Sequence, residues 1–155
     1  MKVEAVILAR AGSKGIVNKN LMDFCGKPLL EWTIDQCTRT KQITDIWVSS
    51  DGDEILKLAS KLGCSTIKRP FELSSDNSSS EDGWIHAIQH IENLKGDTFN
   101  TILAPQPTSP LRKPGDFDKA ITTYFEDKLD SLFSCSIVED LFFWEKDKSK
   151  NFFPS

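Results

Sequence analysis

The 155-residue sequence predicts an α/β fold in which a mostly parallel sheet lies between two layers of helices. Two observations lead to this prediction. Short apolar segments rich in β-branched residues alternate with segments whose apolar residues recur at helical spacing. No internal repeat or linker divides the chain, so residues 1–155 are expected to form a single domain. The predicted architecture is therefore a three-layer α/β/α sandwich with a Rossmann-like sheet, which binds ligands at the carboxyl ends of its strands.

The first half of the chain contains three predicted strands and two predicted helices. Residues 3–9, VEAVILA, are typical of a strand that is buried on both faces. Pro28 opens a stretch with near-helical apolar spacing, and proline is favoured in the first turn of a helix. A strand over 43–50 is followed by a helical pattern that Gly63 ends, and residues 64–68 predict the third strand.

The second half begins with the polar segment RPFELSSDNSSS, residues 69–80, which is expected to be a loop whose serines can also cap a helix. From Ser80 to Leu94 the apolar spacing predicts an amphipathic helix with acidic residues at its positive end, and Gly96 ends it. A strand over 99–104 leads into a proline-rich, irregular loop. The last predicted elements are a helix over 116–128 and a strand over 131–138.

Composition and charge exclude several classes of function. The chain is 39% hydrophobic and 27% charged, as in ordinary globular proteins, and its net charge of -4 argues against binding to nucleic acid or to an anionic membrane. No apolar run approaches the roughly 20 residues that a bilayer requires, and the start of the chain passes directly into a strand pattern. We therefore expect a cytoplasmic protein without a membrane segment.

The cysteines and histidines do not indicate a metal site. His86 and His90 have the spacing of a two-histidine metal helix, but the glutamate of H-E-x-x-H is absent. No two cysteines form a C-x-x-C pair, so we expect buried or idle thiols. The cysteines are Cys25, Cys37, Cys64 and Cys135.

The loop after the first strand, LARAGSKGIVNKNL at 8–21, combines two glycines with three cations and no acid. The glycines allow backbone N–H groups to approach an anion, and the cations can donate charge-assisted hydrogen bonds to phosphate oxygens. Neither G-x-x-x-x-G-K-[ST] nor G-x-G-x-x-G is present. A loop whose cations only keep it soluble is the alternative, but the position at a strand end favours a triphosphate site.

Four ordered motifs resemble the acylneuraminate cytidylyltransferase family, also called CMP-sialic acid synthetases. They are ILARAGSKGIVNKNL at 7–21, GKPLLEWTI at 26–34, RPFELSSDNSSS at 69–80 and PQPTSPLR at 105–112. The resemblance extends over nearly all of the chain, although KDO cytidylyltransferases share parts of the first motif. It implies a fold of the nucleotide-diphospho-sugar transferase type. It also implies transfer of CMP from CTP to the anomeric hydroxyl of a nonulosonic acid such as N-acylneuraminate, with release of pyrophosphate and magnesium (Mg2+) as cofactor.

The resemblance also implies roles for individual residues. Arg10 and Lys19 would be catalytic, neutralising charge that develops on the triphosphate in the transition state. Lys14 and the backbone of residues 11–13 would hold the phosphates, and Asn20 would hold the ribose or order the loop. The implied nucleotide-binding residues are Ala9, Ala11, Gly12, Ser13, Lys14, Asn20, Arg69, Ser78 and Ser80.

Two further motifs would recognise the base and the acceptor. Arg69, Ser78 and Ser80 fall where the family reads cytosine, whereas without the resemblance the serine run is better explained as solvated loop and helix cap. Gln106 falls where the family contacts the acceptor sugar. For Arg112, at the end of the same motif, an ion pair with a local acid is the alternative.

The chain departs from the family pattern in two places. Val17 stands where the family often has proline. Family members also continue through a segment that helps form a dimer to paired aspartates that hold magnesium, and no such pair follows a further strand here. Asp51 and Asp53 are tempting substitutes, but the helix dipole alone favours acids at that position.

We therefore expect a chain that is incomplete at its C-terminus relative to the family, with its metal ligands unassigned and a homodimer as the full-length state. The excess of aromatic residues after residue 139 indicates either a partner surface or a missing continuation. Two alternatives stay open. One is a non-catalytic or degenerate CTP-binding module, and the other is a cytidylyltransferase for another acidic sugar such as KDO, legionaminate or pseudaminate.

Overall fold

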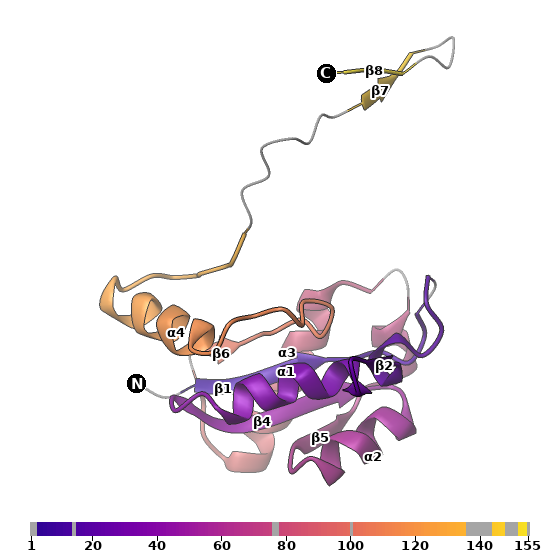
Figure 1. The fold of residues 1–155 in the computed structure, drawn as a ribbon. Helices are drawn as coiled ribbons and strands as arrows, with labels where there is room; N and C mark the ends of the chain where they lie inside the picture. Colours follow the sequence, from indigo (N-terminus) through magenta and orange to yellow (C-terminus); the bar gives the residue numbers. More distant parts are fainter. Residues whose placement is uncertain are drawn as a thin grey trace.

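The computed structural model describes residues 3–13, 15–75, 78–99, 101–135, 144–147 and 152–154. It confirms the α/β/α sandwich, with helices on both faces of a parallel sheet (Figure 1). The strands are β1 (Val3–Leu8), β2 (Asp23–Phe24), β3 (Lys27–Pro28), β4 (Ile43–Ser50), β5 (Ser65–Lys68), β6 (Ile102–Leu103), β7 (Trp144–Lys146) and β8 (Phe152–Pro154). The helices are α1 (Leu29–Thr38), α2 (Asp53–Lys61), α3 (Ser80–Lys95) and α4 (Asp116–Glu126), with 3₁₀ turns η1 (Lys19–Leu21) and η2 (Phe71–Ser74).

The main sheet has the strand order β5-β4-β1-β6, and its neighbouring strands are parallel. The chain first moves outward from β1 through β4 to β5, and then crosses to the other side of β1 to form β6. The strand order therefore reverses between β1 and β6. Ligands of such sheets bind beside this reversal, at the edge where the strands end, here termed the carboxyl edge.

The hydrophobic core has two parts because successive side chains of β1 point to opposite faces of the sheet. Ala5 and Ile7 pack with buried residues of α1 and α2. Val6 packs with α3 on the other face, as Figure 1 shows with α1 in front of the sheet and α3 behind it. Since Ala5, Val6 and Ile7 are all fully buried, the continuous apolar run of β1 is explained by burial on both faces.

Local signals in the sequence explain the ends of α3. Ser79 caps the helix, with its Oγ accepting a hydrogen bond from the Asp82 backbone N–H at 3.0 Å. Gly96 ends it in the left-handed conformation, with φ of 68°. The predicted helices at 80–94 and 116–128 are thereby confirmed within two residues at each end.

Two predicted strands differ from the structure. The predicted strand at 131–138 is wrong for residues 131–135, which form no strand and are exposed; residues 136–138 lie outside the described part of the chain. Phe133 is 84% exposed, so this segment finds neither a pairing partner nor an apolar surface. The strand predicted at 99–104, of which residue 100 is not described, shortens to Ile102–Leu103 because these are the described residues that pair with β1.

Two small antiparallel pairs were not predicted. In the first, Asp23 of β2 faces Pro28 of β3, which places a short hairpin before α1. In the second, Trp144 of β7 faces Pro154 of β8. Phe142 and Phe143 of the aromatic end lie outside the described residues.

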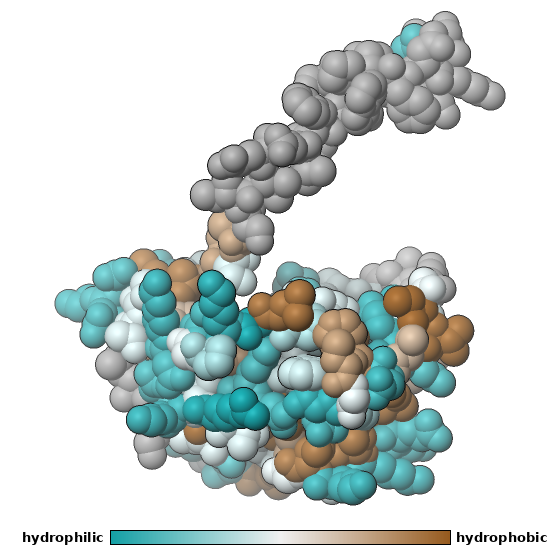
Figure 2. Space-filling view, in the orientation of Figure 1, coloured by the Kyte–Doolittle hydropathy of each residue, from teal (hydrophilic) through white to brown (hydrophobic). Residues whose placement is uncertain are grey.

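The surface seen in Figure 2 is largely hydrophilic, with hydrophobic side chains in separate patches. Exposed hydrophobic residues come from distant parts of the sequence, such as Val17, Phe71 and Leu111. Over the described ranges, none of the helices combines the length and the apolar composition that crossing a bilayer would require.

Candidate functional site

A cavity of about 410 Å³ lies at the carboxyl edge of the sheet, where the loops after β1, β5 and β6 meet. This carboxyl-edge cavity brings together most of the site residues that the sequence predicts, although they come from three separate motifs. The predicted residues that line it are Arg10, Ser13, Lys19, Asn20, Arg69, Ser78, Ser80 and Gln106.

The first wall of the cavity is the loop after β1 that carries Arg10 and Lys19, here termed the cationic loop. Internal hydrogen bonds hold this loop in place. Asn20 is 6% exposed, and its Nδ2 donates to the carbonyl of Arg10 at 3.0 Å. The backbone N–H of Ala11 donates to Asp51 Oδ1 at 2.9 Å, which ties the loop to the end of β4. Of the two roles considered for Asn20, the structure shows the ordering of the loop.

Among the described residues of this loop, Ala9, Ala11 and Gly12 do not line the cavity. Ala9 is buried in the core, and its N–H donates to the carbonyl of Ser49 at 3.0 Å. The backbone donors of Ala9 and Ala11 are thus both engaged within the protein. Gly12 is exposed, and a Cβ built on it would meet no atom within 4 Å, so packing inside the protein does not require a glycine there. Lys14 lies outside the described residues.

The second wall is built around Arg69, which is only 5% exposed. Its Nε donates to Ser74 Oγ at 2.9 Å, and its backbone N–H donates to the carbonyl of Ser50 at 2.8 Å. Burial lowers the pKa of the Arg69 guanidinium, Asp51 acts in the opposite direction, and the positive charge of Arg10 lowers it further. Two cations therefore face the same cavity closely enough to influence each other, which favours an anionic ligand between them.

The serine run on this wall serves more than one purpose. Ser79 caps α3, as the residue pattern predicts without any resemblance. Ser78 Oγ is hydrogen-bonded to Ser75 Oγ at 2.8 Å and also donates to the carbonyl of Glu72. Ser78 and Ser80 line the cavity, so their hydroxyl groups lie where they would contact the hydrogen-bonding groups of a bound ligand.

The third wall is the proline-rich loop after β6, which carries Gln106 into the cavity. The carbonyl of Gln106 accepts hydrogen bonds from Arg112 Nη2 at 2.8 Å and from the Ser109 N–H at 3.2 Å. The ion pair considered for Arg112 is not what the described residues show: its Nη1 donates to Gln36 Oε1 at 2.9 Å instead of to a carboxylate.

Two residues that the sequence did not assign to the site contribute to it. Asp51 holds the cationic loop, although the pattern indicated only a helix start. Trp84 lines the cavity, although its spacing placed it on the core face of α3. Its Nε1 is buried and has no hydrogen-bond partner among the described residues. No local signal identifies either contact, because each depends on a neighbour that is distant in sequence.

The described residues do not supply a metal site by themselves. They contain no group of three or more histidine, cysteine, aspartate or glutamate side chains that could hold an ion. Asp53 pairs with Lys68 Nζ at 2.5 Å, and this hydrogen bond lowers the pKa of the Asp53 carboxyl. Burial raises the pKa of the Cys37 thiol to about 12 and that of Cys64 to about 11, so both stay protonated at neutral pH.

A doubly wound parallel sheet with a polar, cationic cavity at its carboxyl edge is the arrangement that many nucleotide-binding α/β proteins share. The family model for cytidylyltransferases matches residues 5–143. The chain therefore belongs to the cytidylyltransferase family.

Several curated relatives are similar to it. The N-acylneuraminate cytidylyltransferase of Oncorhynchus mykiss is 35% identical over 146 residues, which cover 94% of this chain and 32% of that protein. The N-acylneuraminate cytidylyltransferase of Escherichia coli O18:K1:H7 (strain RS218 / NMEC) is 32% identical over 123 residues, which cover 79% of this chain and 28% of that protein. The chain thus spans about a third of the length of these relatives.

The fold also matches solved structures. A CMP:2-keto-3-deoxy-manno-octonic acid synthetase complexed with CTP superimposes with a TM-score of 0.69 at 21% identity, covering 83% of this chain and 49% of that one. A cytidylyltransferase from Leptospira borgpetersenii serovar Hardjo-bovis (strain JB197) gives 0.63 at 19% identity, covering 83% of this chain and 50% of that one. At these identities the likeness shows the shared fold.

Proposed function

We propose that this chain is the nucleotide-binding part of a cytidylyltransferase that transfers CMP from CTP to the anomeric hydroxyl of a nonulosonic acid such as N-acylneuraminate. One observation carries the proposal: the cations after β1, the arginine and serines after β5 and the glutamine after β6 all line one cavity at the carboxyl edge. The names of the relatives that match most of the chain support the same reaction class and the same kind of acceptor.

The three walls of the cavity would contact the triphosphate, the cytosine and the acceptor sugar, respectively. Arg10 and Lys19 would lie against the triphosphate, and Arg69 with Ser78 and Ser80 would lie against the cytosine. Gln106, on the opposite loop, would contact the sugar, because an amide can both donate to and accept from hydroxyl groups.

In the proposed reaction the anomeric hydroxyl of the sugar loses its proton to water as its oxygen attacks the α-phosphorus of CTP, and pyrophosphate leaves with the electrons of the broken P–O bond. Negative charge increases on the leaving group as this bond breaks. Arg10 and Lys19 would stabilise that charge with charge-assisted hydrogen bonds, which is the main way in which proteins catalyse such transfers. The hydrogen bond that Asn20 donates and the one that Asp51 accepts would keep the loop in position before CTP arrives.

Magnesium, which the sequence resemblance implies, stays part of the proposal. Its protein ligands do not form a cluster among the described residues, since Asp51 and Asp53 are engaged with Ala11 and Lys68. We therefore assign no protein ligand to the ion and derive no step through it.

The lack of a metal-ligand cluster among the described residues favours a second candidate, a CTP-binding module without turnover. The cytoplasmic location and the homodimer also stay predictions.

Two measurements test the proposal. Isothermal titration should show binding of CTP, and pyrophosphate should be released when CTP, magnesium and N-acetylneuraminic acid are all present. Binding without release would instead support the CTP-binding module. Absence of CTP binding would overturn both. KDO, legionaminic acid and pseudaminic acid as alternative acceptors would establish which acidic sugar gives the highest kcat/KM.

A further inference from the structure

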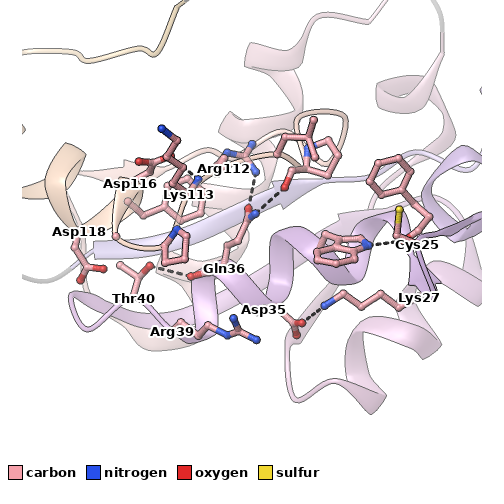
Figure 3. A pocket seen from close by; sticks show the side chains of 17 residues that line it. Cys25, Lys27, Asp35, Gln36, Arg39, Thr40, Arg112, Lys113, Asp116 and Asp118 are labelled. Atoms are coloured by element: carbon pink, nitrogen blue, oxygen red, sulfur yellow. Dashed lines mark hydrogen bonds and ion pairs between the residues drawn. The ribbon is translucent and has the colours of Figure 1, made fainter.

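A second cavity, of about 610 Å³, lies between α1, the β2–β3 hairpin, the loop from residue 110 to 115 and the start of α4 (Figure 3). Here it is termed the α1 cavity. Its inner wall carries Arg112, which comes from the same proline-rich loop as Gln106. The figure shows the guanidinium of Arg112 directed toward Gln36 of α1, across from the loop.

The Arg112 guanidinium connects three parts of the protein. Nη2 donates to the carbonyl of Gln106 at 2.8 Å, while Nη1 donates to Gln36 Oε1 at 2.9 Å. The guanidinium carbon lies 5.0 Å from the centre of the Phe117 ring. A planar group with donors on both sides can satisfy a carbonyl and an amide at once, which the single nitrogen of a lysine cannot do in the same geometry.

Gln36 completes the connection from the other side. Its Oε1 accepts from Arg112, and its Nε2 donates to the carbonyl of Pro110 at 2.8 Å. Both ends of one amide are therefore used on the loop. Gln36 is a suitable anchor because the neighbouring Cys37, on the same helix, is buried in the core.

Gln106 needs such support because the strand before it is short. β6 has only two residues, and the described pairing of β6 is with β1 alone. Three prolines, Pro105, Pro107 and Pro110, remove backbone donors from this loop. Side-chain hydrogen bonds to the carbonyls of Gln106 and Pro110 replace part of the missing backbone ladder.

We propose that Arg112 and Gln36 are positioning residues that fix the backbone of Gln106 and thereby aim its side chain at the acceptor sugar. The inference rests on the proposed function for the identity of the acceptor. The attachment of the loop to α1 is independent of it and is measurable without any ligand. Arg112 and Gln36 act through the loop and touch neither CTP nor the sugar.

The test compares Arg112→Lys and Gln36→Ala with Arg39→Lys. The last is a matched control, because Arg39 lines the same cavity and is exposed. Amide hydrogen exchange of Ser109, whose N–H donates to the Gln106 carbonyl, reports the loop in the free protein. We expect exchange at least about tenfold faster in both variants, with the control unchanged.

The kinetic arm separates positioning from general damage. The KM for the acceptor should rise at least about fivefold in Arg112→Lys and Gln36→Ala, while the Kd for CTP stays within about twofold of wild type. Gln36→Glu keeps the acceptor for Arg112 but loses the donor to Pro110, so its acceptor KM should lie between wild type and Gln36→Ala.

The outcomes distinguish this inference from the proposed function. Unchanged Ser109 exchange in both variants would overturn the inference, as would an unchanged acceptor KM in variants that turn over normally. An equal loss of CTP affinity and acceptor affinity would also overturn it, because that is the result of a merely structural role. A wild-type protein that binds no CTP would instead overturn the proposed function, and with it the acceptor part of the inference.

Discussion

Substitution of Gly52 by alanine tests whether the cationic loop is the nucleotide site. Gly52 follows β4 and precedes α2, and its backbone φ of -93° suits any residue. A Cβ at this position would lie 2.8 Å from the Cβ of Ala11 in the cationic loop. Because the Cβ of Ala11 can move only with its backbone, the loop must shift to accept the new methyl group.

The magnitude follows from that contact. Carbon atoms pack at about 3.5–4.0 Å, so Ala11 must move by about 1 Å. Overpacking costs about 1–3 kcal/mol, and the lower entropy of the unfolded chain offsets about 0.4–1 kcal/mol of it. The net expectation is a loss of about 1–2 kcal/mol in the free energy of unfolding. A loop displaced this far should bind CTP about tenfold more weakly, or about 1.4 kcal/mol.

Isothermal titration with CTP and urea unfolding followed by circular dichroism provide the assay. The exchanged pair Ala11→Gly with Gly52→Ala removes the short contact and should restore CTP affinity to within about threefold of wild type. A Gly52→Ala variant with the CTP affinity of wild type would contradict the assignment of this loop as the nucleotide site. So would a folded double variant that binds as weakly as Gly52→Ala alone.

Three further predictions concern charge. Arg10→Ala and Lys19→Ala should each lower turnover at least about tenfold, or about 1.4 kcal/mol of transition-state stabilisation, in a pyrophosphate-release assay; unchanged kinetics in both would remove them from the mechanism. Glu4→Ala should lower the free energy of unfolding by about 2–4 kcal/mol in urea titrations. The substitution leaves the buried Trp47 N–H, which donates to Glu4 at 2.7 Å, without a partner, and it removes the ion pair between Glu4 and Lys95 at 2.6 Å. CTP affinity should not change in that variant, and a loss below about 1 kcal/mol would contradict the assignment. The Lys95 pKa is raised in the folded protein because hydrogen bonds and the charges of its acidic partners outweigh desolvation. The ion pairs of Lys95 therefore stabilise the folded protein at neutral pH, and this stabilisation is lost as the pH rises through that pKa. The difference in free energy of unfolding between wild type and Lys95→Met should shrink above about pH 10.5. A difference that stays constant with pH would contradict the ion pair.

Elements whose signals are local could be predicted from the sequence. The apolar spacing of α3, its serine cap and its closing glycine lie within one segment, so the prediction is confirmed within two residues. The strand at 131–138 was wrongly predicted for its described residues because a strand also needs a partner, and pairing is decided by distant parts of the chain. The same reason explains why β6 is shorter than its apolar run.

The candidate site shows the same division. The types of residues in the cationic loop predicted an anion site, and the structure places Arg10 and Lys19 in a cavity together. The hydrogen bond from Asn20 to the Arg10 carbonyl shows that Asn20 orders the loop, whereas its contact with the ribose stays a prediction. The contact of Arg112 with Gln36 joins residues 76 positions apart, which no local pattern indicates.

By itself, the sequence determined the four helices, the strands β1, β4 and β5, where the positive charge lies and which loops follow these strands, because periodicity, caps and residue types act over a few residues. The tertiary structure alone decided that the loops after β1, β5 and β6 share one cavity, since this depends on the strand order β5-β4-β1-β6. It also decided which amides and carboxylates are engaged within the protein, because hydrogen bonds such as Ala11 to Asp51 form only once distant segments pack together.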